Sequence, residues 1–209
     1  MRVAVLGGTG SFGRALALRV VVGGEDEVVI GSRDASRAAA TATEIGHGAT
    51  GTTNDDAVRG ADLVVLAVKA DGALETASAI STALGSTPIL SVASAIQVRK
   101  GVGALPDPDA VSLAERIQEL VAAPVCAGLH SIAAASLGAS RPDEDALVCG
   151  DNAASKEVAL SLAARVVAGR ALDAGPLRVA RALEGLTAVI VNLNRRYRTH
   201  AGIRITGIG

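Results

Sequence analysis

Aromatic residues are almost absent from this chain. Its 209 residues include one Phe, Phe12, one Tyr, Tyr197, and no Trp. Lys and Arg together number 20 against 21 for Asp and Glu, which leaves a formal net charge of -1. Proteins that bind nucleic acid usually offer a basic surface and stacking rings, and this sequence provides neither. We therefore expect no nucleic-acid partner.

Cysteine and long apolar runs are also scarce. The two cysteines, Cys126 and Cys149, lie in apolar sequence, which is typical of small buried hydrophobes, and they are too few for a disulfide framework or a zinc site. Charged residues or Gly interrupt the apolar runs well before the roughly 20 residues that a spanning helix needs, and the start of the chain lacks a signal-peptide pattern. The sequence thus predicts a soluble, cytoplasmic protein with no metal site and no membrane partner.

Hydrophobic residues make up 49% of the chain and charged residues 20%, so a sizeable core is available. Short apolar runs alternate with helical stretches over the first 130 residues, which predicts parallel strands joined by right-handed crossover helices. Expected strands lie at 2–6, 27–30, 48–53, 62–68, 87–92 and 124–127, and expected helices at 11–22, 35–45, 55–59, 72–84 and 112–121. The predicted fold class is α/β, with a doubly wound parallel sheet over residues 1–130.

The remainder, residues 131–209, is richer in helical patterns. Its expected elements are a small segment at 131–137, a strand at 146–149, a helix over about 153–167, a strand-like pair at 171–172 and a long helix over about 178–196. No repeat or linker separates this part from the first. We expect a smaller, mostly helical C-terminal domain that packs directly on the sheet domain, with the binding site in the cleft between them.

A glycine-rich loop follows the first expected strand and opens the first expected helix. Its residues are Gly8, Thr9, Gly10, Ser11, Phe12 and Gly13. In this context the G-x-G-x-x-G spacing indicates a dinucleotide-binding (Rossmann) domain, because Gly8 allows a tight turn, Gly10 a close approach to a pyrophosphate and Gly13 close packing of helix on strand. Free N–H groups at the helix start face the phosphates, and Thr9 and Ser11 add hydroxyl donors.

The end of the second expected strand indicates which dinucleotide is bound. An NAD site would carry an acidic residue there to accept from the ribose 2′-hydroxyl, whereas this chain has Ser32 and Arg33, with Arg37 one helical turn further on. Two guanidinium groups and a hydroxyl favour the 2′-phosphate of NADP. The alternative is a solvated basic patch in which Asp34 pairs with Arg37.

The sequence offers no arrangement of side chains for acid–base, nucleophilic or metal-assisted catalysis, so no catalytic residue is predicted. The chemistry must then belong to a cofactor. Hydride transfer from a nicotinamide to another redox ring requires that the two rings be held together and water excluded. Residues 67–70, 91–96 and 130–136 follow successive strands and are mostly small and apolar, as expected of a slot for a flat heterocycle.

Six blocks, kept in order over nearly the full length, resemble one known family. They are residues 5–17, Gly31-Ser32-Arg33, residues 147–151 (Leu-Val-Cys-Gly-Asp), residues 172–177 (Leu-Asp-Ala-Gly-Pro-Leu), residues 184–187 (Glu-Gly-Leu-Thr) and Asn192. The chain is similar in these to the NADPH-dependent reductases of the deazaflavin coenzyme F420. The resemblance implies reversible hydride transfer between NADP(H) and F420, a Rossmann domain with a small C-terminal domain, and a homodimer.

The resemblance also implies binding residues. Nucleotide contacts fall on Thr9 to Phe12, Ser32, Arg33 and Arg37, and contacts near the nicotinamide and deazaflavin fall on Ala70, His130, Ala134, Arg181, Thr187 and Ala201. The chain departs from its relatives at three places. They often have Ile-Pro-Trp at Val68-Lys69-Ala70, Pro at Ala133 and Ser at Gly185. Lys69 either meets the acidic tail of F420 or is a solvated loop residue.

Two of these residues carry alternatives. His130 either donates to a deazaflavin carbonyl or is a structural histidine at a strand end. Arg181 either binds the phosphate of F420 or pairs with Glu184. For the whole protein, the other functions considered are an NADPH-dependent reductase of another acceptor, such as a flavin, a ferric chelate or an imine, and a non-catalytic NADPH-sensing module.

Overall fold

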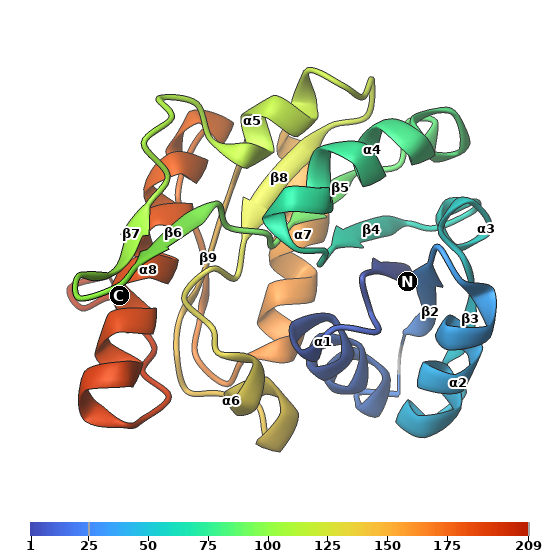
Figure 1. The fold of residues 1–209 in the computed structure, drawn as a ribbon. Helices are drawn as coiled ribbons and strands as arrows, with labels where there is room; N and C mark the ends of the chain where they lie inside the picture. Colours follow the sequence, from blue (N-terminus) through green and yellow to red (C-terminus); the bar gives the residue numbers. More distant parts are fainter. Residues whose placement is uncertain (25, 209) are drawn as a thin grey trace.

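An eight-stranded sheet runs through the molecule, with helices on both of its faces (Figure 1). The computed structural model describes residues 1–24 and 26–208. The strand order is β10-β9-β8-β5-β4-β1-β2-β3, and a separate pair is formed by β6 and β7. The strands are β1 Arg2–Leu6, β2 Glu27–Ser32, β3 Thr50–Thr53, β4 Leu63–Leu66, β5 Ile89–Ser91, β6 Ile96–Arg99, β7 Gly103–Pro106, β8 Val125–Gly128, β9 Ala146–Gly150 and β10 Ala171–Asp173.

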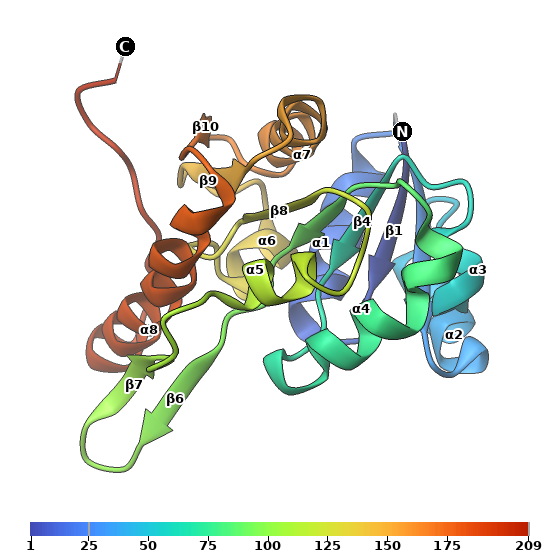
Figure 2. The same ribbon diagram turned by 90° about the horizontal axis from the view of Figure 1, so that it is seen from above.

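Helices lie on both sides of the sheet (Figure 2), and they bury one core on each side. One core lies under α1, α2 and α7, and the other under α3, α4, α5 and the start of α8. In β1, Val3 and Val5 face the first core and Ala4 and Leu6 the second, which is why the strand reads as an unbroken apolar run. The helices are α1 Ser11–Val22, α2 Ala35–Ile45, α3 Asn54–Val58, α4 Ala70–Leu84, α5 Leu113–Gln118, α6 Ala134–Ala139, α7 Ala153–Val166 and α8 Ala180–Tyr197, with a 3-10 turn η1 at Leu177–Val179.

The predicted α/β fold class is confirmed, and so is the burial of Cys126 and Cys149. One pairing differs from a wholly parallel sheet, because β9 runs antiparallel to β8. The connection from β8 to β9 contains only the short helix α6 and does not cross back over the sheet, so β9 starts at the edge where β8 ends. Among the described residues, no helix combines the length and apolarity that a membrane crossing needs.

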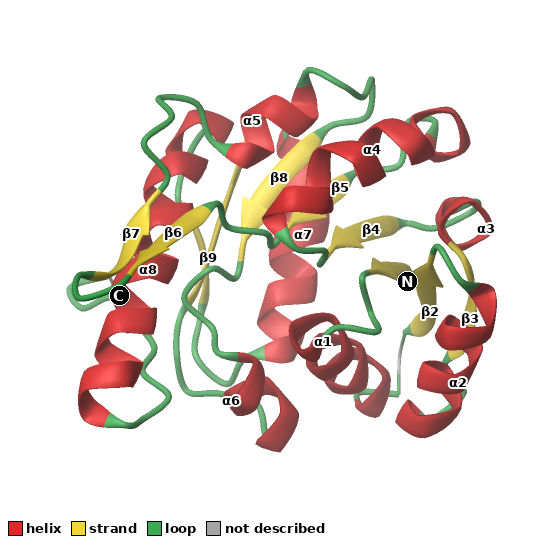
Figure 3. Ribbon diagram, in the orientation of Figure 1, coloured by secondary structure: helices red, strands yellow, loops and turns green. Residues whose placement is uncertain are grey.

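The β6–β7 hairpin was not predicted. It lies apart from the main sheet and packs beside α8 (Figure 3). Asn192 of α8 binds it as a further strand would: its Oδ1 accepts from the N–H of Ala104 at 2.8 Å, and its Nδ2 donates to the carbonyl of Ala104 at 2.7 Å. A contact between residues 88 positions apart maintains this hairpin, so its local sequence gave little indication of it.

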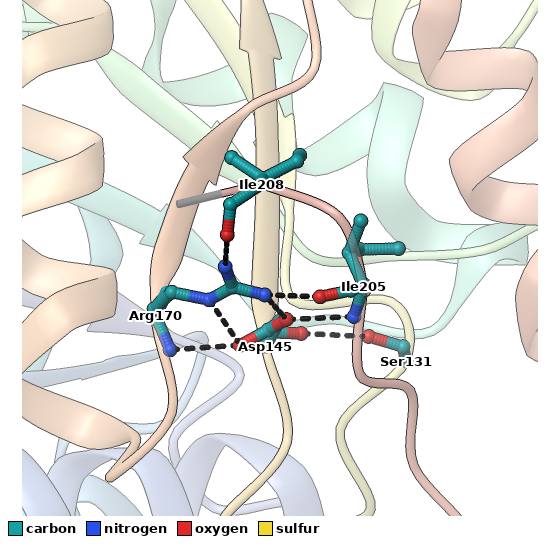
Figure 4. Close-up of polar contacts among 5 residues, drawn as sticks. All are labelled: Ser131, Asp145, Arg170, Ile205 and Ile208. Atoms are coloured by element: carbon teal, nitrogen blue, oxygen red, sulfur yellow. Dashed lines mark hydrogen bonds and ion pairs between the residues drawn. The ribbon is translucent and has the colours of Figure 1, made fainter.

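The C-terminal tail returns from α8 to the start of β9, where Asp145 binds it (Figure 4). Asp145 is 1% exposed, and its Oδ2 accepts from the N–H of Ile205 at 2.8 Å and from Nη2 of Arg170 at 2.7 Å. Arg170 in turn donates to the carbonyls of Ile205 and Ile208. Gly209 lies outside the described residues.

Strands β9 and β10 belong to the second part of the chain but extend the same sheet as the first 130 residues. The division into two domains at residue 130 stays a prediction.

Candidate functional site

The carboxyl ends of five strands, β2, β1, β4, β5 and β8, meet along one edge of the sheet, where doubly wound proteins place their ligands. The glycine loop crosses this edge between β1 and α1. Helix α1 begins after Gly10 with no side-chain cap and no acidic residue in its first turn, so its first N–H groups remain available. A Cβ on Gly13 would stand 2.5 Å from the carbonyl O of Gly7, so the close packing of α1 requires glycine there.

A cavity of about 650 Å³, which we call the outer cavity, opens beside this loop. Arg33 and Arg37 line it with exposed side chains, and within the described chain neither guanidinium has a hydrogen bond or ion pair. Asp34 does not pair with Arg37. Its carboxylate caps α2 and accepts from the N–H groups of Ser36 at 2.9 Å and Arg37 at 3.2 Å. The proposed anion-binding pair is therefore unneutralised.

Asn54 is an outer-cavity residue that the sequence reasoning missed. It follows β3 directly as the first residue of α3, and its Oδ1 is buried without a hydrogen-bond partner in the described structure. A buried, unsatisfied amide oxygen at the edge of a cavity is available to a ligand donor. The only sequence indication was an Asn directly after the strand expected at 48–53. Its place near Ser32 follows from the observed register of β2 and β3, in which Ser32 pairs with Thr53.

A second cavity of about 420 Å³, the inner cavity, lies over the ends of β4, β5 and β8. As expected, its walls are mostly small and apolar; they are formed by Gly10, Ser11, Phe12, Ala67, Val68, Lys69, Ala70, Val92, Ala93, Ser94, Leu129, His130, Ile132 and Thr187. Thr187 comes from α8, so the second part of the chain contributes to this cavity.

A chain of hydrogen bonds ties α8 to the inner cavity. Thr187 Oγ1 donates to the carbonyl of His130 at 3.0 Å, and Ser94 Oγ lies 2.7 Å from Thr187 Oγ1. Because a hydroxyl has one proton and a carbonyl can only accept, Ser94 must be the donor to Thr187. Ser94 Oγ keeps its acceptor lone pairs for a ligand. Its role was not anticipated, because Ser94 and Thr187 are 93 residues apart.

His130 is 8% exposed, and Nε2 lies 3.2 Å from the carbonyl O of Ala93. That contact requires the proton on Nε2, so Nδ1 is an acceptor, and Nδ1 is buried with no partner in the described structure. Burial lowers the pKa of His130 to about 4, which leaves the ring neutral at pH 7. His130 is thus both anchored to the backbone and available as an acceptor.

The structure gathers most of the predicted binding residues and leaves three elsewhere. Thr9, Gly10, Ser32, Arg33 and Arg37 line the outer cavity, Gly10, Ser11, Phe12, Ala70, His130 and Thr187 line the inner cavity, and Gly8 and Gly13 are buried beneath the loop. Ala134 lines a separate hollow of about 290 Å³ beside α1. Arg181 donates through Nε to the carbonyl of Asp109, and Ala201 donates through its N–H to Asn194 Oδ1.

The expected alternative for Arg181, a pair with Glu184, is not formed. Glu184 is 4% exposed, and its carboxylate accepts from the N–H groups of Leu113 and Ala114, both at 3.1 Å. It therefore caps α5 from α8. Burial raises the pKa of Glu184, and the two backbone donors oppose that effect.

The fold and the glycine loop together are those of the dinucleotide-binding Rossmann class. Within that class, the model of the family described as "NADP oxidoreductase coenzyme F420-dependent" matches residues 2–95. An "F420-dependent NADP reductase" of Methanothermobacter thermautotrophicus is 37% identical, with 100% of this chain and 96% of the relative covered. A protein of the same description from Methanocaldococcus jannaschii is 32% identical, with 100% and 99% covered. The chain therefore belongs to the F420-dependent NADP oxidoreductase family.

A solved structure supports the same architecture over the whole length. A crystal structure from Arthrobacter sp. FB24 superposes with a TM-score of 0.85 at 26% sequence identity, covering 99% of this chain and 100% of that one. The comparison extends over both the glycine-loop part and the C-terminal part, so the similarity includes the elements that carry Thr187.

Proposed function

We propose that this protein transfers a hydride reversibly between NADP(H) and coenzyme F420. Family membership over the full chain supports this function and does not favour the other acceptors or the non-catalytic module. When bound, the two coenzymes supply the chemistry, a hydride exchanged between C4 of the nicotinamide and C5 of the deazaflavin. The chain supplies positions, hydrogen bonds and the exclusion of water.

The residues of the outer cavity fit the adenosine half of NADP. Arg33 and Arg37 present guanidinium groups without a hydrogen bond or ion pair in the described chain. Of the three carboxylates that line the cavity, that of Asp34 caps α2, and those of Asp71 and Glu75 pair with neither arginine. A phosphate between two such groups gains charge-assisted hydrogen bonds. The N–H groups at the start of α1 suit the pyrophosphate. This uncompensated pair is the observation that carries the choice of NADP over NAD.

Nucleotide choice is tested by titrating the protein with NADPH and NADH. Arg33→Ala should weaken NADPH by roughly 10-fold to 100-fold, because a hydrogen bond to a charged group is worth about 1.5–3 kcal/mol. The affinity for NADH should not change. Arg195→Ala, which removes an exposed arginine on α8, is the matched control and should bind both as wild type does. Equal affinity of the wild type for NADPH and NADH would refute the assignment.

The inner cavity suits a pair of stacked rings. Its walls are mostly small and apolar. Of the polar residues that line it, His130 has a buried Nδ1 without a partner in the described structure, and Ser94 Oγ keeps its acceptor lone pairs. Ring imide and carboxamide N–H groups are the donors that such acceptors bind. The neutral His130 places no charge against the rings. No side chain of the cavity is required to act as acid or base.

The reaction itself is tested by mixing the protein with NADPH and oxidised F420 and following the loss of deazaflavin absorbance. A panel of flavin, ferric chelate and imine acceptors under the same conditions serves as the control for acceptor choice. Reduction of F420 well above the panel is the expected result. Bound NADPH without any bleaching of F420 would refute the function.

We further propose that residues 1–130 bind NADP and that residues 131–209 close the F420 cleft in a cytoplasmic homodimer. Thr187 on α8 supports the closing role. Exposed apolar side chains of α8 and the hairpin support self-association: Val98, Val102, Val189, Leu193 and Tyr197. Light scattering should show a dimer that Val189→Glu converts to a monomer.

Ala134, Arg181 and Ala201 are proposed contacts of the outlying parts of F420. In the described structure Arg181 uses only its Nε, which donates to the carbonyl of Asp109, so its two terminal nitrogens remain available to a ligand.

A further inference from the structure

The inner and outer cavities share one wall. Gly10, Ala67, Val68 and Lys69 line both of them. Gly10 belongs to the glycine loop after β1, and the other three belong to the connection from β4 to α4. A ligand that occupies both cavities has to pass between these two connections.

The dinucleotide is such a ligand, and this step rests on the proposed function. With its 2′-phosphate at Arg33 and its nicotinamide beside His130, the part that crosses the shared wall is the pyrophosphate, which joins the two halves and carries two negative charges. The uncapped start of α1 offers backbone N–H groups from one side. From the other side, Lys69 offers the single charged side chain among the four shared residues.

Lys69 is exposed, and its ammonium has no hydrogen bond or ion pair within the described chain. The two acidic residues of α4 that face this region, Asp71 and Glu75, line the outer cavity and not the shared wall. Lys69 is therefore not committed to either carboxylate. The flexible side chain of a lysine can bring its ammonium to a phosphate from many directions, whereas a guanidinium binds a phosphate best in one fixed orientation.

We propose that Lys69 binds the pyrophosphate of NADP(H). Of the two possibilities raised by the sequence, a solvated loop lysine would not be expected to line both cavities, and a residue reserved for the acidic tail of F420 would not be expected to line the nucleotide cavity. Lys69 acts as a nucleotide-binding residue in this chain.

The experiment measures binding without turnover. Lys69→Gln should weaken NADPH and NADH by the same factor, about 10-fold, because both carry the pyrophosphate. Adenosine 2′-monophosphate, which has the 2′-phosphate but no pyrophosphate, should compete equally well with wild type and variant when each inhibition constant is corrected for its own NADPH affinity. Arg33→Ala should give the opposite pattern, with NADPH and adenosine 2′-monophosphate weakened and NADH unchanged. Lys69→Arg, which keeps the charge, should bind both dinucleotides more tightly than Lys69→Gln does, and Lys100→Gln, in the exposed turn of the β6–β7 hairpin, is the matched control.

The salt dependence adds a second readout. Because screening weakens the attraction of an exposed ammonium for a phosphate, NADPH affinity should fall less steeply with added NaCl in Lys69→Gln than in wild type. Unchanged affinity for both dinucleotides in Lys69→Gln would overturn the proposal, whether or not the KM for F420 rises. If the binding pattern holds but wild type does not reduce F420, the hydride-transfer function fails and the assignment of Lys69 stands.

Discussion

Replacing Asp145 with Asn tests the hydrogen bonds that join the C-terminal tail to β9. The carboxylate is 1% exposed and accepts four donors: on Oδ1 the N–H of Arg170 at 2.9 Å and its Nε at 3.3 Å, and on Oδ2 the N–H of Ile205 at 2.8 Å and Nη2 of Arg170 at 2.7 Å. Asn keeps the shape of the side chain but replaces one carboxylate oxygen by an NH₂ group. The two N–H donors that bound that oxygen then lie against another donor and lose their hydrogen bonds.

The cost follows from these contacts. Breaking a buried charge pair by removing one partner costs about 3–5 kcal/mol, and we take the lower end because the Arg170 side chain is 42% exposed and keeps access to water. About 3 kcal/mol corresponds to a fall in Tm of roughly 6–12 °C for a chain of this size. Asp109→Asn, at an exposed pair with Arg116, should cost less than about 0.5 kcal/mol and is the control.

The contribution of Asp145 to stability should depend on pH in one direction only. The Arg170 side chain and the backbone N–H groups of Arg170 and Ile205 hold the pKa of Asp145 well below its ordinary 3.8. A carboxyl whose folded pKa is depressed contributes stability that is present above the unfolded pKa and is lost as pH falls toward the folded one. The Tm gap between wild type and Asp145→Asn should therefore be constant at pH 5–8 and should narrow below about pH 4.

Differential scanning calorimetry measures both effects, and amide exchange of residues 203–208 shows whether the tail is released. The pKa values of Asp26 and Asp173 are also lowered, but both residues are present in the two proteins, so their contributions cancel in the gap. A Tm within about 2 °C of wild type at pH 7, or a gap that stays the same down to pH 3, would refute the reasoning.

Three further changes test the site and its support. Asn192→Leu leaves both backbone groups of Ala104 without a partner and should lower the free energy of unfolding by about 2 kcal/mol in urea titrations; an unchanged midpoint would contradict this. With a folded pKa of about 4, His130 should remain neutral in NMR titrations down to pH 5, and its contribution to stability should fall as pH drops through 6.5; a midpoint near 6.5 in the native protein would disprove the assignment. Thr187→Val leaves the carbonyl of His130 without its donor and should raise the KM for F420 more than 10-fold, whereas Thr187→Ser should stay within about 2-fold; equal KM values would rule the contact out.

Much of the fold could be predicted because its determinants are local. The runs 11–22 and 35–45 were predicted as helices with the same bounds that α1 and α2 have, since Gly23 ends the first and Asp34 caps the second. The hairpin escaped prediction for the opposite reason. Apolar and polar residues alternate only weakly in its two strands. The side chain that hydrogen-bonds to the free edge of β7, Asn192, lies on α8. The antiparallel direction of β9 likewise depends on the path of the whole connection from β8, which does not cross back over the sheet.

The same distinction separates the parts of the site. The glycine loop, Ser32, Arg33 and Arg37 could be assigned from spacing, because each stands at a fixed distance from the end of its own strand. Ser94 could not, since nothing near it in sequence indicates that it donates a hydrogen bond to a hydroxyl on α8. Asn54 could not either, because an unsatisfied buried oxygen becomes visible only after the surrounding backbone has been placed.

Helix α8 is anchored by three side chains that hydrogen-bond to the backbone of other elements. Glu184, Thr187 and Asn192 each bind the backbone of a different element: Glu184 the start of α5, Thr187 the carbonyl after β8, and Asn192 the strand β7. Three separate anchors fix both the rotation and the height of the helix, and the second places a hydroxyl in the wall of the inner cavity. A substitution at Glu184 or Asn192 should therefore act on F420 through the position of Thr187, and its effect on KM should disappear in a Thr187→Val background, because the contact that the helix positions is already absent there.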